Sequence, residues 1–130
     1  MDKLGLGRKI ERLVMERWVW KGYIVWQPPR AQYRKLADGG TDIFGLFDFV
    51  GVKSDCPVNL VQVKRTRRQE AQRAYDAIQD FARMHPCPID PYLVLWKRQK
   101  DRLLFDAWLL TPMGWTDAGQ WTEVDSGAHK

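Results

Sequence analysis

The chain has 130 residues, of which 45% are hydrophobic and 28% charged, and its formal net charge is +5. This length predicts one domain spanning residues 1–130, and the composition excludes a disordered chain. The apolar runs are too short to cross a bilayer and the charged N-terminus lacks a secretory core, so we expect no membrane partner and a cytoplasmic protein, in the host cytoplasm if the gene is viral.

The predicted elements begin with a helix, because apolar residues recur at helical spacing from Ile10 to Trp18. A β-branched and aromatic strand follows, and then a loop of about a dozen residues with three basic side chains. The full prediction is a helix at 7–21, strands at 23–27, 43–53 and 58–65, a helix at 67–84, and strands at 92–98 and 102–110. The order α-β-β-β-α-β-β predicts an α/β domain with a central mixed sheet flanked by helices. Its core spans about 5–112, and 113–130 is expected to be an irregular tail.

Three polar side chains stand inside the most strand-like stretch. Asp48 lies in the strand 43–53, and Gln62 and Lys64 share one face of the strand 58–65. Buried charged groups need partners, so one interpretation is an ion pair between Asp48 and Lys64 with Gln62 hydrogen-bonded nearby. The other is a divalent-metal site in which Asp48 and Gln62 hold Mg²⁺, or Mn²⁺, and Lys64 assists the attacking water. The spacing alone favours the first.

The order of motifs resembles the PD-(D/E)XK nuclease superfamily, and within it the archaeal-type Holliday junction resolvases. The matching segments are Gly7-Arg8-Lys9-Ile10-Glu11-Arg12, Phe47-Asp48-Phe49-Val50 and Val61-Gln62-Val63-Lys64-Arg65, and the match covers roughly 5–85. Phe47 replaces the proline of the family motif and Gln62 replaces its usual acid. Asp42 is a candidate to restore the missing charge, and the alternative for it is a turn or strand-start residue.

This resemblance implies a restriction-endonuclease-like fold and a metal-dependent endodeoxyribonuclease. Asp48, Gln62 and the Val63 backbone carbonyl would hold the metal, Lys64 would activate water, and Glu11 would complete the site as a further metal ligand. The implied substrate is a four-way DNA junction, nicked symmetrically by a homodimer, and we place the dimer seam at the apolar strands 92–96 and 103–110. The alternatives are another DNA nuclease of this fold, acting on flaps, ends or specific sites, and a DNA-binding protein that has lost catalysis through Gln62.

Positive charge gathers around these candidates. Residues 1–89 contain 16 Lys and Arg against 10 Asp and Glu, a balance of +6, whereas residues 90–130 contain 5 against 6, a balance of −1. Such asymmetry favours a polyanionic partner, although single basic residues on a helix are commonly just solvated. The predicted DNA-binding residues are Arg8, Lys9, Arg12, Arg30, Arg34, Lys35, Arg65, Arg67, Arg68 and Arg73. The chain also has seven tryptophans, most of them expected in the core; Trp115 and Trp121 are expected to cover the core or the dimer seam.

Overall fold

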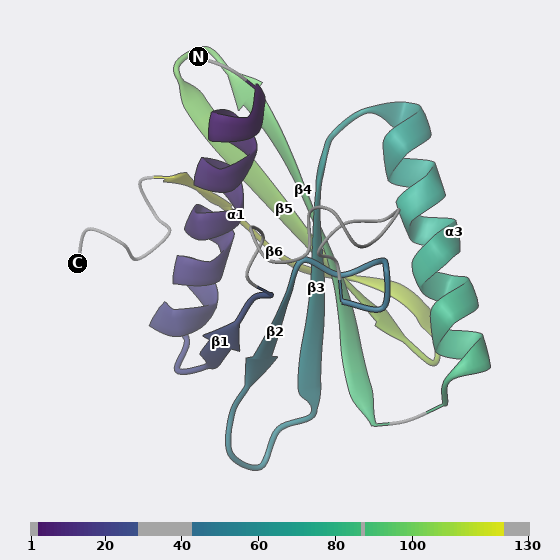
Figure 1. Cartoon of the computed structure of the whole chain (residues 1–130). Coiled ribbons are helices and arrows are strands. Elements are labelled where there is room, and N and C mark those ends of the chain that lie inside the picture. The colour runs from purple at the N-terminus through teal and green to yellow at the C-terminus, as the bar shows by residue number, and fades with distance from the viewer. Residues whose placement is uncertain (1–2, 29–42, 87, 124–130) are drawn as a thin grey trace.

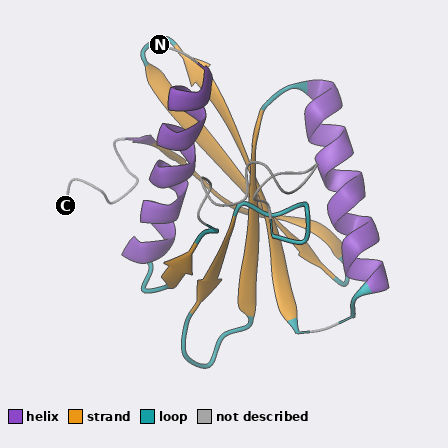
Figure 2. Cartoon of the chain, viewed as in Figure 1, coloured by secondary structure: helices purple, strands orange, loops and turns teal. Residues whose placement is uncertain are grey.

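The computed structural model describes residues 3–28, 43–86 and 88–123, and it has α/β architecture with a six-stranded mixed sheet and two helices (Figures 1 and 2). In chain order the elements are α1 (Lys3–Trp20), β1 (Ile24–Trp26), β2 (Phe49–Val52), β3 (Val58–Arg65), α3 (Arg68–Met84), β4 (Ile89–Gln99), β5 (Arg102–Thr111) and β6 (Gly114–Thr122). The predicted α/β class is therefore confirmed. The predicted order α-β-β-β-α-β-β is wrong in one respect, because it lacks the sixth strand, β6, which follows β5.

The strands lie in the sheet in the same order as in the chain, from β1 to β6. Every neighbouring pair is antiparallel except β3 and β4, which are parallel and are joined through α3. A parallel pair needs such a crossover, and a helix is its usual form. Helix α1 lies on one face of the sheet and α3 on the other (Figure 1).

The core is divided between these two faces. On the first face, Ile10, Val14 and Trp18 of α1 pack against residues such as Phe49 and Val61. On the second face, α3 buries Ala74 and Ile78 against a set that includes Phe47, Leu60, Leu93 and Leu95. Because successive strand residues point to opposite faces, β3 contributes Val61 and Val63 to the α1 face and Leu60 to the α3 face. Gln62 and Lys64 follow Leu60 on the α3 face.

Asn59 is the most buried polar side chain and links α1 to β3. Its side chain is 1% exposed. With the amide oriented to suit its neighbours, its oxygen accepts a hydrogen bond from Trp18 Nε1 at 2.9 Å and its nitrogen donates to the Pro57 carbonyl at 3.2 Å. Both polar ends of a buried amide are thus satisfied, as burial requires.

The predicted strand at 43–53 is only partly present. Strand β2 covers Phe49–Val52, and the preceding residues form a tight turn in which the Ile43 amide donates to the Phe47 carbonyl at 2.7 Å. Phe44 and Gly45 have φ of 56° and 70°, in the left-handed region that an extended strand cannot contain. The chain therefore reverses direction just before Asp48.

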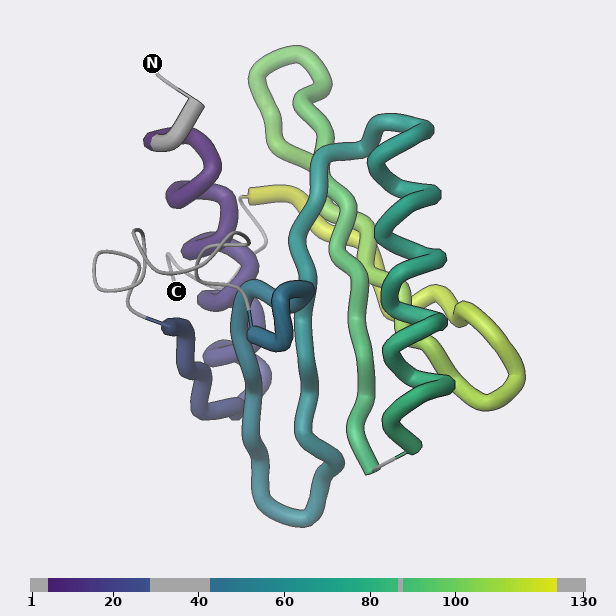
Figure 3. The backbone as a smooth tube through the Cα atoms, turned by 45° about the vertical axis from the view of Figure 1, so that its right-hand side comes forward, coloured from purple at the N-terminus to yellow at the C-terminus, as the bar shows by residue number. Residues whose placement is uncertain are grey.

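The predicted irregular tail is also wrong, because β6 occupies Gly114–Thr122 and pairs with β5. Trp121 is 6% exposed and stacks on Phe105 with ring centroids 5.3 Å apart, so the expectation that it covers the core is confirmed. The β5–β6 hairpin lies beside α3 in the turned view of Figure 3, and there Trp115 packs on Tyr75 at 5.0 Å.

Burial bears on two further expectations. Leu93, Leu95 and Phe105 of the predicted dimer seam are at most 7% exposed within the core of the single chain, whereas Trp108, Leu109 and Leu110 are half-buried, so the seam stays a prediction. Trp20 and Trp26, expected in the core, are 49% and 56% exposed. Among the described residues, no helix is long and apolar enough to cross a membrane.

Candidate functional site

Asp48 occupies the point where β2 begins. The turn Ile43–Phe47 ends on Phe47, which is fully buried against Phe81 of α3 with ring centroids 5.3 Å apart. This anchor fixes the residue that follows it. Asp48 is half-buried, and its backbone amide donates to the Val61 carbonyl at 2.8 Å. The sequence therefore holds Asp48 at the junction of the turn and the sheet.

The Asp48 carboxylate is fixed by the neighbouring strand. Its Oδ2 accepts a hydrogen bond from the backbone amide of Val63 at 2.7 Å. Hydrogen bonds to ionised acceptors are about twice as strong as neutral ones, so this contact holds the carboxylate firmly against β3. In the part of the chain that the structure describes, Asp48 and Lys64 form no ion pair. The ion-pair interpretation of these two residues is therefore wrong.

Gln62 is buried with an unsatisfied oxygen. Its side chain is 6% exposed, and its Oε1 has no hydrogen-bond partner among the described residues. Leaving a buried polar group unpaired costs about 1–3 kcal/mol, and such groups often mark a site that takes a ligand. Gln62 stands between Leu60 and Lys64 on the face of β3 that α3 covers.

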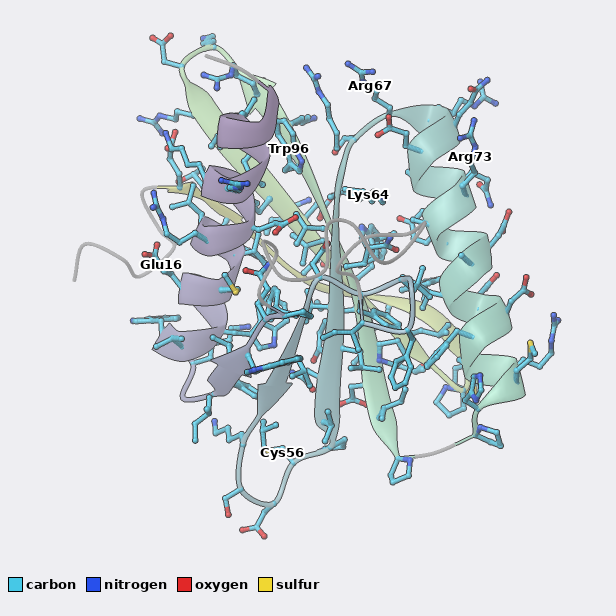
Figure 4. All side chains as sticks on the ribbon, viewed as in Figure 1. Glu16, Cys56, Lys64, Arg67, Arg73 and Trp96 are labelled. Atoms are coloured by element: carbon cyan, nitrogen blue, oxygen red, sulfur yellow. The ribbon has the colours of Figure 1, made fainter. Side chains whose placement is uncertain are left out.

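Lys64 is exposed at the end of the same face. Figure 4 shows it on the C-terminal half of β3, on the side toward α3 and below Arg67. The structure thus brings together Gln62, Val63 and Lys64, which lie on β3, and Asp48, which directly precedes the neighbouring strand β2. All four belong to the predicted site.

Glu11 lies on α1 and has a partner that the sequence reasoning did not single out. Its Oε1 accepts a hydrogen bond from Gln27 Nε2 at 2.8 Å. Gln27 directly follows β1, whose Trp26 pairs with Val50 of β2, so this contact reaches the end of the sheet at which Asp48 lies. The contact joins residues 16 apart in the chain, and no local pattern signals it.

A groove of about 410 Å³ surrounds Glu11 and Gln27. Three of the predicted DNA-binding residues, Arg8, Lys9 and Arg12, line it. Arg8 and Arg12 are exposed and Lys9 is half-buried. Three of the predicted DNA-binding residues therefore lie around Glu11.

The second basic group follows β3. Arg65, Arg67, Arg68 and Arg73 are all exposed, and Figure 4 shows Arg67 in the connection to α3 and Arg73 on that helix. The Arg65 guanidinium lies over the ring of Trp96, 5.3 Å from its centroid. Arg67, Arg68 and Arg73 thus flank the end of β3 that carries Lys64. The Arg65 guanidinium instead makes a cation–π contact with Trp96. The remaining predicted residues, Asp42, Arg30, Arg34 and Lys35, lie outside the described residues.

Asp106 is a second acidic side chain on the α3 face that the sequence reasoning missed. It is aligned across the sheet with Leu95 and, one strand further, with Lys64. Its Oδ1 is buried without a hydrogen-bond partner among the described residues, and the residue lines a cavity of about 370 Å³ with Thr66 and Lys97. Burial, and then the charge of Asp106, raise the pKa of the Tyr75 hydroxyl above its usual range.

The residues around Asp48 offer oxygen atoms of three kinds. Asp48 supplies a carboxylate, Gln62 an amide oxygen and Val63 a backbone carbonyl, and Mg²⁺ prefers oxygen ligands of these kinds. Only one of the three carries charge. The sequence matches no protein-family model and no curated protein, so the interpretation of this site rests on its own residues.

Proposed function

We propose that the protein is a Mg²⁺-dependent endonuclease that cleaves branched DNA, with four-way junctions as its substrate. One observation carries this proposal: Gln62, whose buried amide oxygen has no hydrogen-bond partner among the described residues, directly precedes Val63, whose backbone amide holds the Asp48 carboxylate, and Lys64 follows on the same face of β3 as Gln62. A purely structural Gln in a core would be expected to have its polar atoms paired.

The residues fit a bound divalent cation. Asp48, Gln62 and the Val63 carbonyl would hold Mg²⁺, or Mn²⁺ in its place, and the bound cation would stabilise charge on the phosphate and lower the pKa of a coordinated water. The Val63 amide holds Asp48 Oδ2 and so orients the carboxylate at the end of the β2–β3 ladder. Since the site carries a single negative charge, its affinity for the cation should be modest.

Lys64 is the candidate catalytic residue. Its side chain is exposed, so its ammonium group can approach a phosphodiester without breaking core contacts. In that position it would orient the attacking water and neutralise the charge that develops on phosphorus oxygens in the transition state. Among the described residues no ion pair joins Lys64 to Asp48, so the ammonium group need not leave a partner to approach the phosphate.

Glu11 would complete the site from the α1 side of the sheet. Gln27 holds its carboxylate at the end of β1, whereas Gln62 and Lys64 occupy the α3 face of β3. Glu11 therefore lies on the other side of the sheet from Gln62 and Lys64. All three can contact one substrate only at the end of the sheet where the β2–β3 ladder stops, beside Asp48 and Val63. We therefore assign Gln27 as a positioning residue for Glu11.

The exposed basic residues supply the DNA contacts. Arg8 and Arg12 flank Glu11, and Arg67, Arg68 and Arg73 flank Lys64, so positive charge lies on both sides of the proposed site. Contacts of this kind neutralise phosphates without reading sequence, and they make affinity fall steeply with salt. This suits recognition of DNA by its shape. We further propose that the fold is restriction-endonuclease-like, with β5 and β6 extending its sheet.

A second candidate function is binding of branched DNA without cleavage. The specific observation that favours it is the single charge of the donor set, because Gln62 stands where a second carboxylate would strengthen metal binding. In this case the fold and the basic residues would bind the junction and the chemistry would be absent.

The test compares a labelled four-way junction with a linear duplex of the same sequence, each incubated with the protein in Mg²⁺ or in EDTA. Paired symmetric nicks in the junction alone, only with Mg²⁺, support junction resolution. Cleavage of both substrates indicates a less selective nuclease of this kind. Salt-sensitive junction binding without any cleavage in Mg²⁺ or Mn²⁺ establishes the second candidate, and binding that does not respond to salt contradicts both.

A further inference from the structure

A row of aligned residues crosses the sheet from the proposed catalytic lysine. Lys64 of β3 is aligned with Leu95 of β4, which is aligned in turn with Asp106 of β5. Gln120 of β6 continues the row beyond Asp106. Paired residues of neighbouring strands point to the same face, so these side chains all lie on the α3 face. Strands lie about 4.8 Å apart, which puts Asp106 on the order of 10 Å from Lys64.

Asp106 carries a carboxylate that lacks a donor. Its Oδ1 is buried and has no hydrogen-bond partner among the described residues. Burial, and then the charge of Asp106, raise the pKa of the Tyr75 hydroxyl, yet within the described part of the chain that hydroxyl does not donate to Asp106. No ion pair between described residues joins Asp106 to Lys97 either. A buried acceptor without a donor is costly, and a ligand that supplies an N–H or O–H group would reduce that cost.

Asp106 lines a cavity of about 370 Å³, which we call the Asp106 cavity. Leu95 and Leu104 contribute apolar side chains to its lining, and Gln120 and Thr122 contribute an amide and a hydroxyl. The last two belong to β6, so the strand that the sequence reasoning missed forms part of the cavity. Its volume and its mixture of apolar and polar groups are typical of a site for a small molecule or for one unit of a polymer.

The sheet is distorted beside Asp106. The register of the β5–β6 ladder shifts between Ala107 and Trp108, directly after Asp106, and Gly119, the partner of Ala107, has φ of 119°. Irregularities of this kind are common next to functional sites, where they change the direction of a side chain. Figures 1 and 3 show the β4–β5 hairpin set apart from the start of α3, at the end of the sheet where β3 leads into that helix.

The charges around the Asp106 cavity fit a nucleotide better than a cation or an anion alone. Lys97 is exposed in its lining and Lys64 is exposed in the same row, so a divalent cation would be repelled. The described residues also include no group of three or more His, Cys, Asp or Glu side chains that could hold a metal. A free anion would meet the Asp106 carboxylate. A nucleotide has a phosphate for the two lysines and, on most bases, an amino group that can donate to a carboxylate.

We propose that the Asp106 cavity binds an unpaired base with an amino group, next to the phosphate that is cleaved at Lys64. A base that leaves the stack at the branch of a junction is read on its Watson–Crick edge, and its ring packs on apolar side chains. Asp106 accepts from the amino group, Leu95 and Leu104 contact the ring, and Lys97 neutralises a flanking phosphate. The inference rests on the proposed function for the presence of DNA at Lys64. It adds a base preference to contacts that otherwise recognise only the backbone.

The test measures, by fluorescence anisotropy in EDTA, how the full chain binds two labelled single strands of roughly eight nucleotides. One strand contains only deoxycytidine and the other only deoxyuridine. The two bases have the same size, but cytosine carries its N4 amino group where uracil carries the O4 carbonyl. Wild type should bind the deoxycytidine strand at least ~5-fold more tightly, the low end of the discrimination given by one good base contact.

Asp106→Asn should abolish this difference. The variant should bind the deoxyuridine strand no more weakly than wild type does, because the phosphate contacts remain and one negative charge is gone. Loss of structure would instead weaken the binding of both strands. The matched control is Asp101→Asn, which removes the same charge from the β4–β5 turn, where Asp101 is exposed and outside the lining of the cavity. This control should keep the difference.

Equal affinity of wild type for the two strands overturns the inference without any variant, and so does failure to bind either strand. A difference that persists in Asp106→Asn, with a native circular dichroism spectrum, overturns it as well. The measurement needs neither metal nor cleavage, so its failure is distinguishable from failure of the proposed function. A protein that nicks a junction in Mg²⁺ without discriminating the strands keeps the chemistry and loses the base pocket. One that prefers deoxycytidine but cleaves nothing keeps the pocket and loses the chemistry.

Discussion

The Asp48 carboxylate accepts a hydrogen bond from the Val63 backbone amide at 2.7 Å, and this contact joins the start of β2 to the strand that carries Gln62 and Lys64. It replaces a rung of the β2–β3 ladder, which ends at Phe49 and Val61. A side chain that substitutes for backbone pairing fixes the separation of the two strands. Asp48 is thereby held next to the strand that carries Gln62 and Lys64, and the three polar side chains form one local group.

Asp48→Asn should weaken divalent-cation binding while preserving the fold. The amide oxygen of Asn can still accept the hydrogen bond from Val63, so we expect the free energy of unfolding to change by no more than about 1 kcal/mol. Loss of the carboxylate removes the one charge of the donor set. Titration with Mn²⁺, followed by calorimetry, should show binding to wild type and at least ~10-fold weaker binding to the variant. Asp117→Asn is the control, because Asp117 is exposed and its Oδ1 accepts from Gly119; equal loss in both variants would contradict the assignment.

Gln62→Glu should make stability depend on the metal. Without a cation the new carboxylate is buried beside Asp48, and we expect a loss of about 1–3 kcal/mol in the free energy of unfolding. With Mg²⁺ bound, the second charge should strengthen binding by ~10-fold or more and restore that stability. Chemical denaturation with and without Mg²⁺ measures both effects. Equal destabilisation of the variant in the two conditions would show that Gln62 is only a core residue.

Asp90→Asn should alter the pH dependence of stability. Burial raises the pKa of Asp90 above its usual 3.8, so the folded state disfavours the charged form. The stability that Asp90 contributes is therefore complete below pH 3.8 and is lost as the pH rises through the raised pKa. The Asn variant lacks this loss, so its free energy of unfolding should exceed that of wild type at pH 7 and the two should converge in acid. Urea denaturation of both proteins from acid pH to pH 7 measures these free energies of unfolding. A variant that is less stable than wild type at pH 7 would contradict the account.

The same carboxylate acts on Tyr92. Burial first, and then the charge of Asp90, raise the pKa of Tyr92 to about 12. Ultraviolet titration of wild type should show one tyrosine ionising near that value. In Asp90→Asn that tyrosine should ionise at lower pH, because one of the negative charges that oppose its ionisation is gone. An unchanged titration would show that the two groups do not interact.

Lys100→Gly should stabilise the β4–β5 hairpin. Gln99 pairs with Arg102, which leaves Lys100 in a two-residue turn with φ of 57°. The left-handed conformation costs a residue with a side chain about 1–2 kcal/mol, and Gly adopts it freely at some entropic cost. We expect a net gain of about 0.5–1 kcal/mol in thermal unfolding. Lys97→Gly, in the extended part of β4, should destabilise by a similar amount, and a gain in both would contradict the role of φ.

Most of the fold could be predicted from local patterns. The strand at 58–65 has its predicted bounds, and the predicted helix at 67–84 differs from α3 by one residue. The first is a short run rich in β-branched and apolar residues, and the second has apolar residues at helical spacing. Helix α1 ends at Trp20, one residue before its predicted end at 21, and Gly22 follows with φ of 99°. These features depend on residues close together in the chain, which is why the sequence predicts them well.

The parts that could not be predicted depend on distant contacts. Strand β6 contains Gly, Asp and Gln among its residues, and it is extended because β5 supplies its hydrogen bonds. The turn at Phe44 and Gly45 interrupts an apolar run that favours a strand. Within the site, the order of motifs predicted Asp48, Gln62 and Lys64, but the Gln27–Glu11 bond and the buried Asp106 oxygen arise only when the sheet is assembled.

The most direct test of the proposed chemistry is single-turnover cleavage of a saturating four-way junction by wild type and by Lys64→Ala in Mg²⁺. Lys64 is exposed and makes no core contact, so the variant should fold and should bind the junction nearly as well as wild type. We predict that its cleavage rate falls on the order of 100-fold or more, while Arg73→Ala, which removes a flanking charge, cleaves at close to the wild-type rate once the junction is saturating. A Lys64→Ala enzyme that cleaves as fast as wild type would contradict the account.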